Sequence, residues 1–216
     1  MKKYIYIIFL LFIIYLGGLI IKNLFYQNIK IIKDPDNLLV LVNKNNRLPD
    51  DFVPKNLEKI NLAFANEDKY MVKEAKEQFE KLSAEANSIG YNIIAVSTYR
   101  SYDYQEKLFT GYIKEKGEEH TLNYSAKPGH SEHQTGLAVD VMGSNNDYNL
   151  FEESIEFEWM VNNAHKYGFI LRYPKDKYEI TGFKYEPWHY RYVGRTIANY
   201  IYNNNLTLEE YIKKNK

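Results

Sequence analysis

The chain has 216 residues and no internal repeat, which is enough for one good-sized folded domain. Its 28 Lys and Arg residues balance 28 Asp and Glu residues, so it lacks the basic surplus that binds a nucleic-acid backbone, and we expect no nucleic-acid partner. The lack of cysteine excludes disulfides, thiolate metal sites and a cysteine nucleophile, so any transition metal must be held by His, Asp or Glu.

The N-terminus carries Lys2 and Lys3 followed by an uncharged, mostly apolar run over residues 4–21. As a helix this run would rise about 27 Å, close to the roughly 30 Å of a bilayer's hydrocarbon core. A cleavable signal peptide is the alternative, but its apolar region is usually about 7–15 residues long and ends in small residues, whereas here residues 19–21 continue the run. We therefore predict an uncleaved transmembrane anchor at residues 1–22, with one pass through the cell membrane and the rest of the chain outside the cytoplasm.

The segment after the anchor is polar. We expect residues 23–37 to form a tether, and the stretch that follows contains Pro49 and Pro54, which disfavour regular structure. We place the packed domain at residues 38–205 and a C-terminal helix or tail at residues 206–216.

Apolar spacing predicts the elements of this domain. Helices are expected over residues 67–88, 102–116 and 152–167, each followed by a glycine that can end it, with shorter helices over 194–203 and 208–213. Strands are expected over residues 91–96, 137–141, 169–173 and 185–193. Long helices mixed with short strands, without a regular alternation, favour an α+β fold over a doubly wound sheet.

The motif S-E-H-Q-T-G-L-A-V-D, residues 131–140, sets His133 and Asp140 seven positions apart. On one helix these two side chains would lie about 10.5 Å apart along the axis, too far to share a metal ion. The residues after Gly136 alternate in the manner of a strand, and glycine permits a turn before it. We therefore predict a loop that bends at Gly136 into a strand, which could bring both side chains to one ion.

A second motif, Y-E-P-W-H-Y at residues 185–190, sets Glu186 and His189 three positions apart around Pro187, which fixes the backbone. A ligand histidine and a catalytic carboxylate could face one ion from such a segment. The spacing E-x-x-H alone is common by chance, and the helical zinc motif H-E-x-x-H is absent. Two histidines and one carboxylate with an open fourth position nevertheless form a standard catalytic zinc set.

A third motif, S-T-Y-R-S-Y-D-Y-Q at residues 97–105, lies between a predicted strand and a predicted helix. Arg100 could offer its guanidinium group to a developing oxyanion or to a substrate carboxylate. The alternative is a surface arginine that pairs with Asp103.

The remaining histidines carry weaker signals. His120 lies in a polar run and His165 lies among polar residues, so we expect surface or structural roles for both. His130 adjoins the 131–140 motif as a neighbour without an assigned direction. The segment 116–129 contains two glycines and a proline, and we expect it to form one wall of a substrate groove.

In this order, S-T-Y-R-S-x3-Q, S-E-H-Q-T-G-L-A-V-D and E-P-W-H resemble the motifs of VanY-type D-alanyl-D-alanine carboxypeptidases and their L,D-carboxypeptidase relatives, zinc peptidases of bacterial cell walls. The pattern S-x-H-x-x-G-x-A-x-D is complete and is joined by the downstream E-x-W-H. The resemblance covers residues 38–202 and implies a single compact α+β domain of the hedgehog/DD-peptidase type. It places the Zn²⁺ ligands on His133, Asp140 and His189, and the general base on Glu186.

The resemblance also assigns substrate contacts. It implies that Arg100 stabilises the oxyanion of the scissile carbonyl, and that Ser131 and Gln105 hold the C-terminal end of the peptide. Zinc lowers the pKa of bound water towards about 7, and a nearby Glu186 can take its proton, so the residue chemistry supports the same mechanism.

We therefore expect a monomeric zinc carboxypeptidase that removes the C-terminal D-alanine from peptidoglycan stem peptides. One alternative is an L,D-carboxypeptidase that acts on tetrapeptide stems. Another is a zinc-containing domain that binds wall peptide without hydrolysis, although the presence of Glu186 and Arg100 favours an enzyme.

Overall fold

A computed structural model describes residues 6, 7, 9 and 25–215. Within that part of the chain, no helix combines the length and the apolar character that a membrane crossing needs. The predicted anchor at residues 1–22 lies outside the described residues except at positions 6, 7 and 9, so it stays a prediction.

A four-stranded antiparallel sheet forms the centre of the domain, in the order β5 (Ile94–Ser97), β6 (Ala138–Met142), β8 (His189–Tyr192), β7 (Phe169–Leu171). Side chains alternate between the two faces of a strand. In β6, Val139 and Val141 are fully buried in the core, whereas Asp140 points to the opposite face. The sheet therefore separates an apolar core from a polar face.

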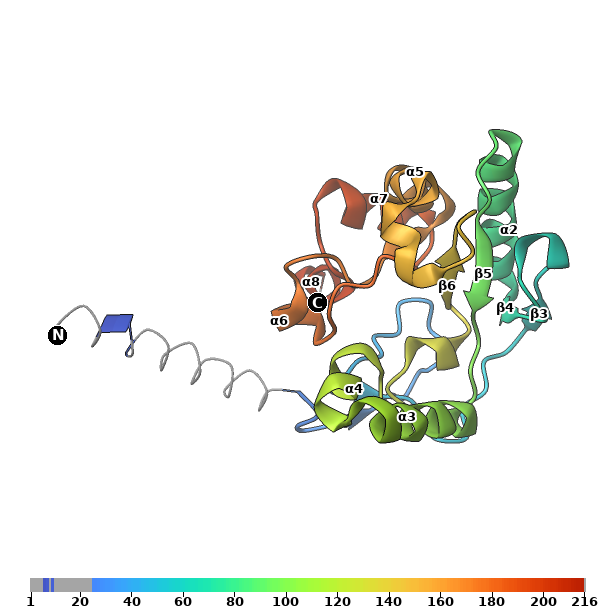
Figure 1. The fold of residues 1–216 in the computed structure, drawn as a ribbon. Coiled ribbons are helices and arrows are strands. Elements are labelled where there is room, and N and C mark those ends of the chain that lie inside the picture. The colour runs from blue at the N-terminus through green and yellow to red at the C-terminus, as the bar shows by residue number, and fades with distance from the viewer. Residues whose placement is uncertain (1–5, 8, 10–24, 216) are drawn as a thin grey trace.

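The helix α2 (Lys73–Ser88) covers the apolar face, and it runs alongside β5 in Figure 1. Its buried residues follow helical spacing, and the Phe79 ring packs edge-on against Phe169 of β7 at 6.1 Å. The sequence predicted this helix from residue 67, which is wrong at its start. Residues Tyr70–Val72 form strand β4, because this β-prone stretch pairs with β3 (Leu57–Lys59) and buries Met71 completely.

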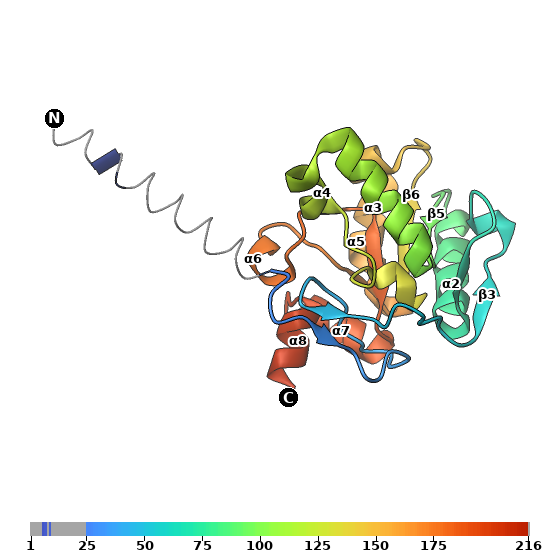
Figure 2. The ribbon, with the colours of Figure 1, turned by 90° about the horizontal axis from the view of Figure 1, so that it is seen from below.

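The other helices surround the sheet, and Figures 1 and 2 both show α3 and α4 side by side. They are α3 (Tyr102–Lys116), α4 (Glu118–Tyr124), α5 (Ile155–Asn163), α6 (Tyr178–Thr181), α7 (Arg195–Asn203) and α8 (Leu208–Lys214). Short 3-10 turns lie at Leu62–Phe64, Glu132–Thr135, Tyr148–Glu153 and Ala164–Tyr167. The predicted α+β class is confirmed by this mixture of helices around a small antiparallel sheet.

Both ends of the described chain pack against this domain. Strand β1 (Lys30–Ile31) pairs with β2 (Asn46–Arg47), and the buried Lys44 ammonium group lies 5.2 Å from the Phe25 ring and 5.6 Å from the Tyr26 ring. In the predicted tether at residues 23–37, Phe25 and Tyr26 thus lie beside Lys44 of the domain, because aromatic rings attract the ammonium group. At the other end, Leu208 is fully buried, so α8 belongs to the packed domain as well.

Candidate metal centre and active-site groove

Strand pairing places Asp140 beside His189. The two residues lie directly opposite each other in the register of β6 and β8, where side chains share a face with Cβ atoms about 4.5–5.5 Å apart. His189 Nδ1 is 2.8 Å from Asp140 Oδ1. Asp140 therefore comes from a central strand, whose neighbours on both sides fix its position.

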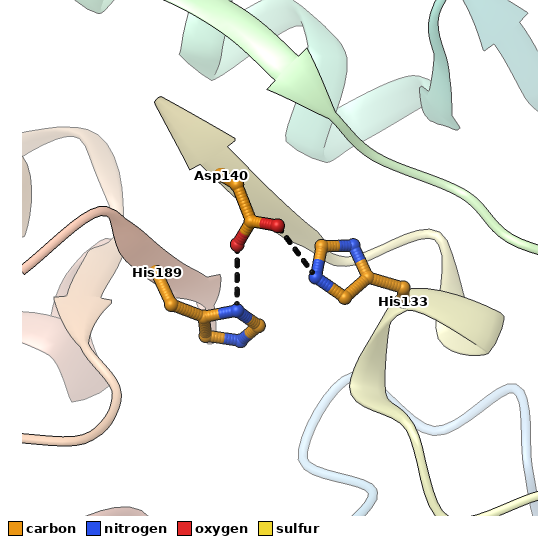
Figure 3. Close-up of side chains that lie close together, drawn as sticks. All are labelled: His133, Asp140 and His189. Carbon is orange, nitrogen blue, oxygen red and sulfur yellow. Dashed lines mark hydrogen bonds and ion pairs between the residues drawn. The ribbon is translucent and has the colours of Figure 1, made fainter. Parts of the chain in front are cut away.

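His133 reaches the same carboxylate from a turn. It lies in the 3-10 turn Glu132–Thr135, which begins with Ser131 Oγ accepting a hydrogen bond from the His133 backbone N–H at 3.3 Å. Gly136 ends the turn with φ +66°, and β6 follows at once, so the chain bends where the sequence predicted. His133 Nε2 lies 3.2 Å from Asp140 Oδ2, and Figure 3 shows both imidazole rings turned towards Asp140.

The donor atoms suit a metal ion. One atom from each of His133, Asp140 and His189 lies within 4.8 Å of the others. His133 Nδ1 lies 2.7 Å from the Thr98 carbonyl oxygen, so Nδ1 carries the proton and Nε2 keeps its lone pair for a ligand. Two imidazole nitrogens and one carboxylate are the donor set of many catalytic zinc sites, so the residues present fit Zn²⁺.

The two histidines differ in their protonation. Burial and the positive charge of Arg100 lower the pKa of His133 to about 4, so its ring is neutral. Burial also opposes the charged form of His189, but the nearby carboxylates of Asp140 and Glu132 outweigh it and raise the pKa of His189 to about 9. A metal cation would replace the positive charge that this proton supplies beside Asp140.

Glu186 lies next to this cluster. It belongs to the turn before β8, in which the His189 backbone N–H donates to the Glu186 carbonyl oxygen at 3.3 Å. The carboxyl Oε2 lies 3.9 Å from His189 Nδ1, and the residue is 6% exposed. Burial raises the pKa of Glu186 to about 8, although the positive charge of His189 opposes the shift. A buried carboxyl group with a shifted pKa beside a candidate metal cluster is typical of functional sites.

Arg100 faces the groove from the loop after β5. Its Nη1 donates to Ser97 Oγ at 3.0 Å, so it does not make the surface pair with Asp103 that was the alternative. Its Nε is buried without a hydrogen-bond partner among the described residues. Arg100 as a residue lines the groove, so its guanidinium group lies beside the space that a substrate would fill.

The two predicted substrate residues are placed differently. Ser131 lies in the wall of the groove. Gln105 is 1% exposed, and its side-chain Nε2 donates to the Ala126 carbonyl oxygen at 2.8 Å, so it braces the segment that leads into the 131–140 motif. The structure thus gives Gln105 a contact with the groove wall, and its contact with substrate stays a prediction.

A groove of about 1160 Å³ runs past the cluster. Its walls include His133, Asp140 and His189, together with Tyr70 of β4 and with His120 and Tyr124 of α4. The segment 116–129 was expected to form a wall, and it does so as a helix that the sequence did not reveal.

The other histidines lie away from the donor atoms. His165 is buried and stacks on Tyr202 with ring centroids 3.7 Å apart, and His120 is exposed near Tyr124. His130, the neighbour of the 131–140 motif, has its Nδ1 2.9 Å from the Asn43 carbonyl oxygen, which is a structural contact.

Sequence reasoning missed a buried charge network behind the site. Glu132 accepts from Arg172 Nε and Arg191 Nη1, both at 2.8 Å, and Arg172 also donates to both carboxyl oxygens of Glu209 in α8. The side chains of Glu132 and both arginines are fully buried. Burial disfavours the charged form of Glu132, but the two guanidinium groups outweigh it and hold the pKa of Glu132 below its ordinary value. The glutamate between Ser131 and His133 was the only sequence signal for it.

Comparison with known proteins agrees with this geometry. The VanY family model, described as D-alanyl-D-alanine carboxypeptidase, matches residues 68–195. The putative carboxypeptidase YodJ of Bacillus subtilis (strain 168) is 44% identical over an alignment of 197 residues, and the match covers 88% of this chain and 72% of YodJ.

Solved structures give the same result. The LdcB LD-carboxypeptidase, in a structure said to reveal the molecular basis of peptidoglycan recognition, matches with TM-score 0.81 and 43% identity over 87% of this chain and 91% of its own. A mutant of the vancomycin resistance D,D-pentapeptidase VanY in complex with Zn(II) matches with TM-score 0.68 and 34% identity over 81% of this chain and 98% of its own. The fold and these relatives define a carboxypeptidase. The chain belongs to the VanY family of D-alanyl-D-alanine carboxypeptidases.

Proposed function

We propose that this enzyme is a zinc-dependent D,D-carboxypeptidase that removes the C-terminal D-alanine from peptidoglycan stem peptides. The observation that supports it is the buried Glu186 carboxyl group beside the cluster of His133, Asp140 and His189. Membership of the VanY family and the Zn(II) complex of a related D,D-pentapeptidase also support it.

The proposed mechanism assigns one task to each group. Zn²⁺ bound by the three ligands would polarise the scissile carbonyl and lower the pKa of a water molecule. Glu186 takes a proton from the attacking water and hands it to the leaving amine of D-alanine. The guanidinium group of Arg100, which lines the groove, donates to the carbonyl oxygen as negative charge develops on it, an interaction that is stronger in the transition state than in the ground state.

A carboxypeptidase must also hold a free carboxylate. We assign this task to Ser131, which lies in the groove wall, and to the segment that Gln105 holds in place through Ala126. This end of the groove would set which terminal residue is removed.

An L,D-carboxypeptidase is the second candidate. It is supported by the similarity to LdcB, whose structure is described as an LD-carboxypeptidase. The two activities differ in the stem peptide, because D,D activity removes D-alanine from a pentapeptide and L,D activity removes it from a tetrapeptide.

Mass spectrometry of both stem peptides after incubation with the zinc-loaded enzyme separates these candidates. Loss of one alanine from the pentapeptide is the expected result. Trimming of the tetrapeptide alone would replace the D,D assignment by the L,D assignment. No cleavage of either peptide by protein shown to hold zinc would contradict both.

We further propose that residues 1–22 anchor the enzyme in the cell membrane with the catalytic domain outside the cytoplasm, on the basis of the uncharged run over residues 4–21. Fractionation and protease treatment of intact spheroplasts test this proposal. The enzyme should sediment with membranes and be digested from outside, whereas a freely soluble or protease-protected enzyme would contradict it.

A further inference from the structure

Glu132 has one carboxyl oxygen that the buried charge network does not use. Its Oε1 accepts from Arg172 Nε and Arg191 Nη1, both at 2.8 Å. Its Oε2 is buried and has no hydrogen-bond partner in the described part of the chain. A fully buried carboxylate oxygen without a hydrogen bond destabilises the folded protein. Its position therefore calls for a structural or functional explanation.

The atom that faces this oxygen is also buried and also lacks a hydrogen-bond partner in the described part of the chain. His189 Nε2 lies 3.5 Å from Glu132 Oε2, and residues 25–215 offer it no hydrogen bond either. The other ring nitrogen, Nδ1, is turned towards Asp140 at 2.8 Å. The Tyr173 ring lies against the His189 imidazole at 4.9 Å between centroids and at 30°, which limits rotation of that imidazole.

We propose that Glu132 is a positioning residue that fixes the tautomer and the orientation of His189. When the metal is bound, Glu132 Oε2 accepts the Nε2–H of His189, which leaves the Nδ1 lone pair for the metal. Ligand histidines commonly donate their other N–H to a carboxylate in this way, which orients the ring and makes it a stronger ligand. The inference rests on the metal site of the proposed function.

The arginines explain why a carboxylate can occupy this position. Arg172 is held by both oxygens of Glu209, and Arg191 Nη2 donates to the backbone oxygens of Leu38 and Val40, each at 3.0 Å. Both guanidinium groups are thus fixed by elements on two sides, and together they direct one oxygen of Glu132 away from them and towards His189. The charges of two glutamates and two arginines balance, so the network is neutral as a unit.

Glu132→Gln tests the role, with Glu209→Gln as the matched control. The first substitution puts an amide opposite His189 Nε2. The second removes the same charge from the same network at a position that is hydrogen-bonded to Arg172 and Asn43. The readout is zinc affinity of the full-length chain in mild detergent, measured by competition with a chromophoric chelator. We expect Glu132→Gln to weaken zinc binding by about 10–100-fold and Glu209→Gln to leave it unchanged.

Equal zinc affinity in the wild type and in Glu132→Gln would overturn the proposal, and so would an equal loss in both variants, which would mean that any disturbance of the network suffices. If Glu132→Gln does not fold, long-range ¹H–¹⁵N spectra of the zinc-loaded wild type decide the question. A His189 ring protonated at Nε2 and bound through Nδ1 supports the role, and the reverse tautomer overturns it. A wild type that binds no zinc would instead overturn the proposed function, so the two failures are distinguishable.

Discussion

Burial shifts the pKa of Glu186 and also makes this residue unfavourable for the stability of the fold. Removal from water raises the pKa of Glu186 to about 8, which means that the metal-free protein holds a proton on this carboxyl group at neutral pH. A divalent cation within reach of the carboxylate would favour the ionised form and so prepare the base for its task. Residues placed in this way commonly reduce stability in exchange for activity.

Replacing Glu186 with glutamine should abolish turnover and leave zinc binding intact. The amide cannot accept a proton, so we expect the rate of alanine release to fall by about 10²–10⁴-fold, while the three ligands are unchanged. Metal analysis and a stem-peptide assay on the same sample measure both effects. Glu179→Gln, at an exposed position of α6, is the control that should keep both. Retained turnover in Glu186→Gln would exclude Glu186 as the base.

The same substitution should stabilise the metal-free protein in a pH-dependent way. Because the pKa of Glu186 is raised from 4.5 to about 8 by burial, the folded state binds the proton more tightly than the unfolded state, and the wild type loses stability as pH rises through this interval. Glutamine does not titrate, so the melting temperature of Glu186→Gln should exceed that of the wild type above pH 8, by about 2–4 °C for each kcal/mol gained. The difference should vanish below pH 4.5. Melting curves in chelator that differ equally at every pH would contradict this reading.

At the scale of single residues, the motifs and their resemblance to a known family selected the cluster but not the residues that support it. Two short motifs contain His133, Asp140, His189 and Glu186, whose side chains are of the types that bind metal ions and transfer protons. The fold brings these residues together. Glu132 gave no such signal, because its partners Arg172 and Arg191 are far along the chain and meet it only in the folded protein.

At the scale of elements, periodicity predicted the helices and strands whose apolar faces are continuous. Helix α3 was predicted with both of its ends, since Ser101 caps it and Gly117 follows it. Helix α4 was missed because its seven residues are mostly polar and only Thr121 is buried. Strand β4 was assigned to α2, since a β-prone stretch next to a helix is ambiguous until its pairing partner is known.

Gly136 lies between the turn that carries His133 and the strand β6 that carries Asp140, so the geometry of the site depends on its backbone conformation. Its φ of +66° turns the chain from His133 into β6, and an added Cβ would lie 2.9 Å from Leu57 Cδ2. Gly136→Ala should therefore lower the free energy of unfolding by about 2–4 kcal/mol, through the left-handed backbone and the crowding together.

Denaturant unfolding measures this effect, with Gly111→Ala as the control. Gly111 lies inside α3 with nothing within 4 Å of an added Cβ, so alanine there should stabilise the protein by about 0.5–1 kcal/mol. Similar stability of Gly136→Ala and the wild type would show that the turn does not depend on glycine.

At the scale of the whole molecule, the two ends of the described chain contribute to the domain that holds the groove. Phe25 and Tyr26 pack around Lys44, and Glu209 of α8 binds the arginine that contacts Glu132. The sequence suggested a tether at residues 23–37 and a C-terminal helix or tail at residues 206–216, and only the folded structure shows which of the described residues there are covered. A soluble enzyme should therefore begin at Phe25 and keep α8.

The proposed mechanism requires a metal ion held by His133, Asp140 and His189. Its most direct test is alanine release from a stem peptide by protein stripped with a chelator and then titrated with Zn²⁺. We predict that stripped protein is inactive and that activity returns in proportion to bound zinc, reaching its maximum when each chain holds a single ion. Full turnover by protein that elemental analysis shows to be free of metal would contradict the claim.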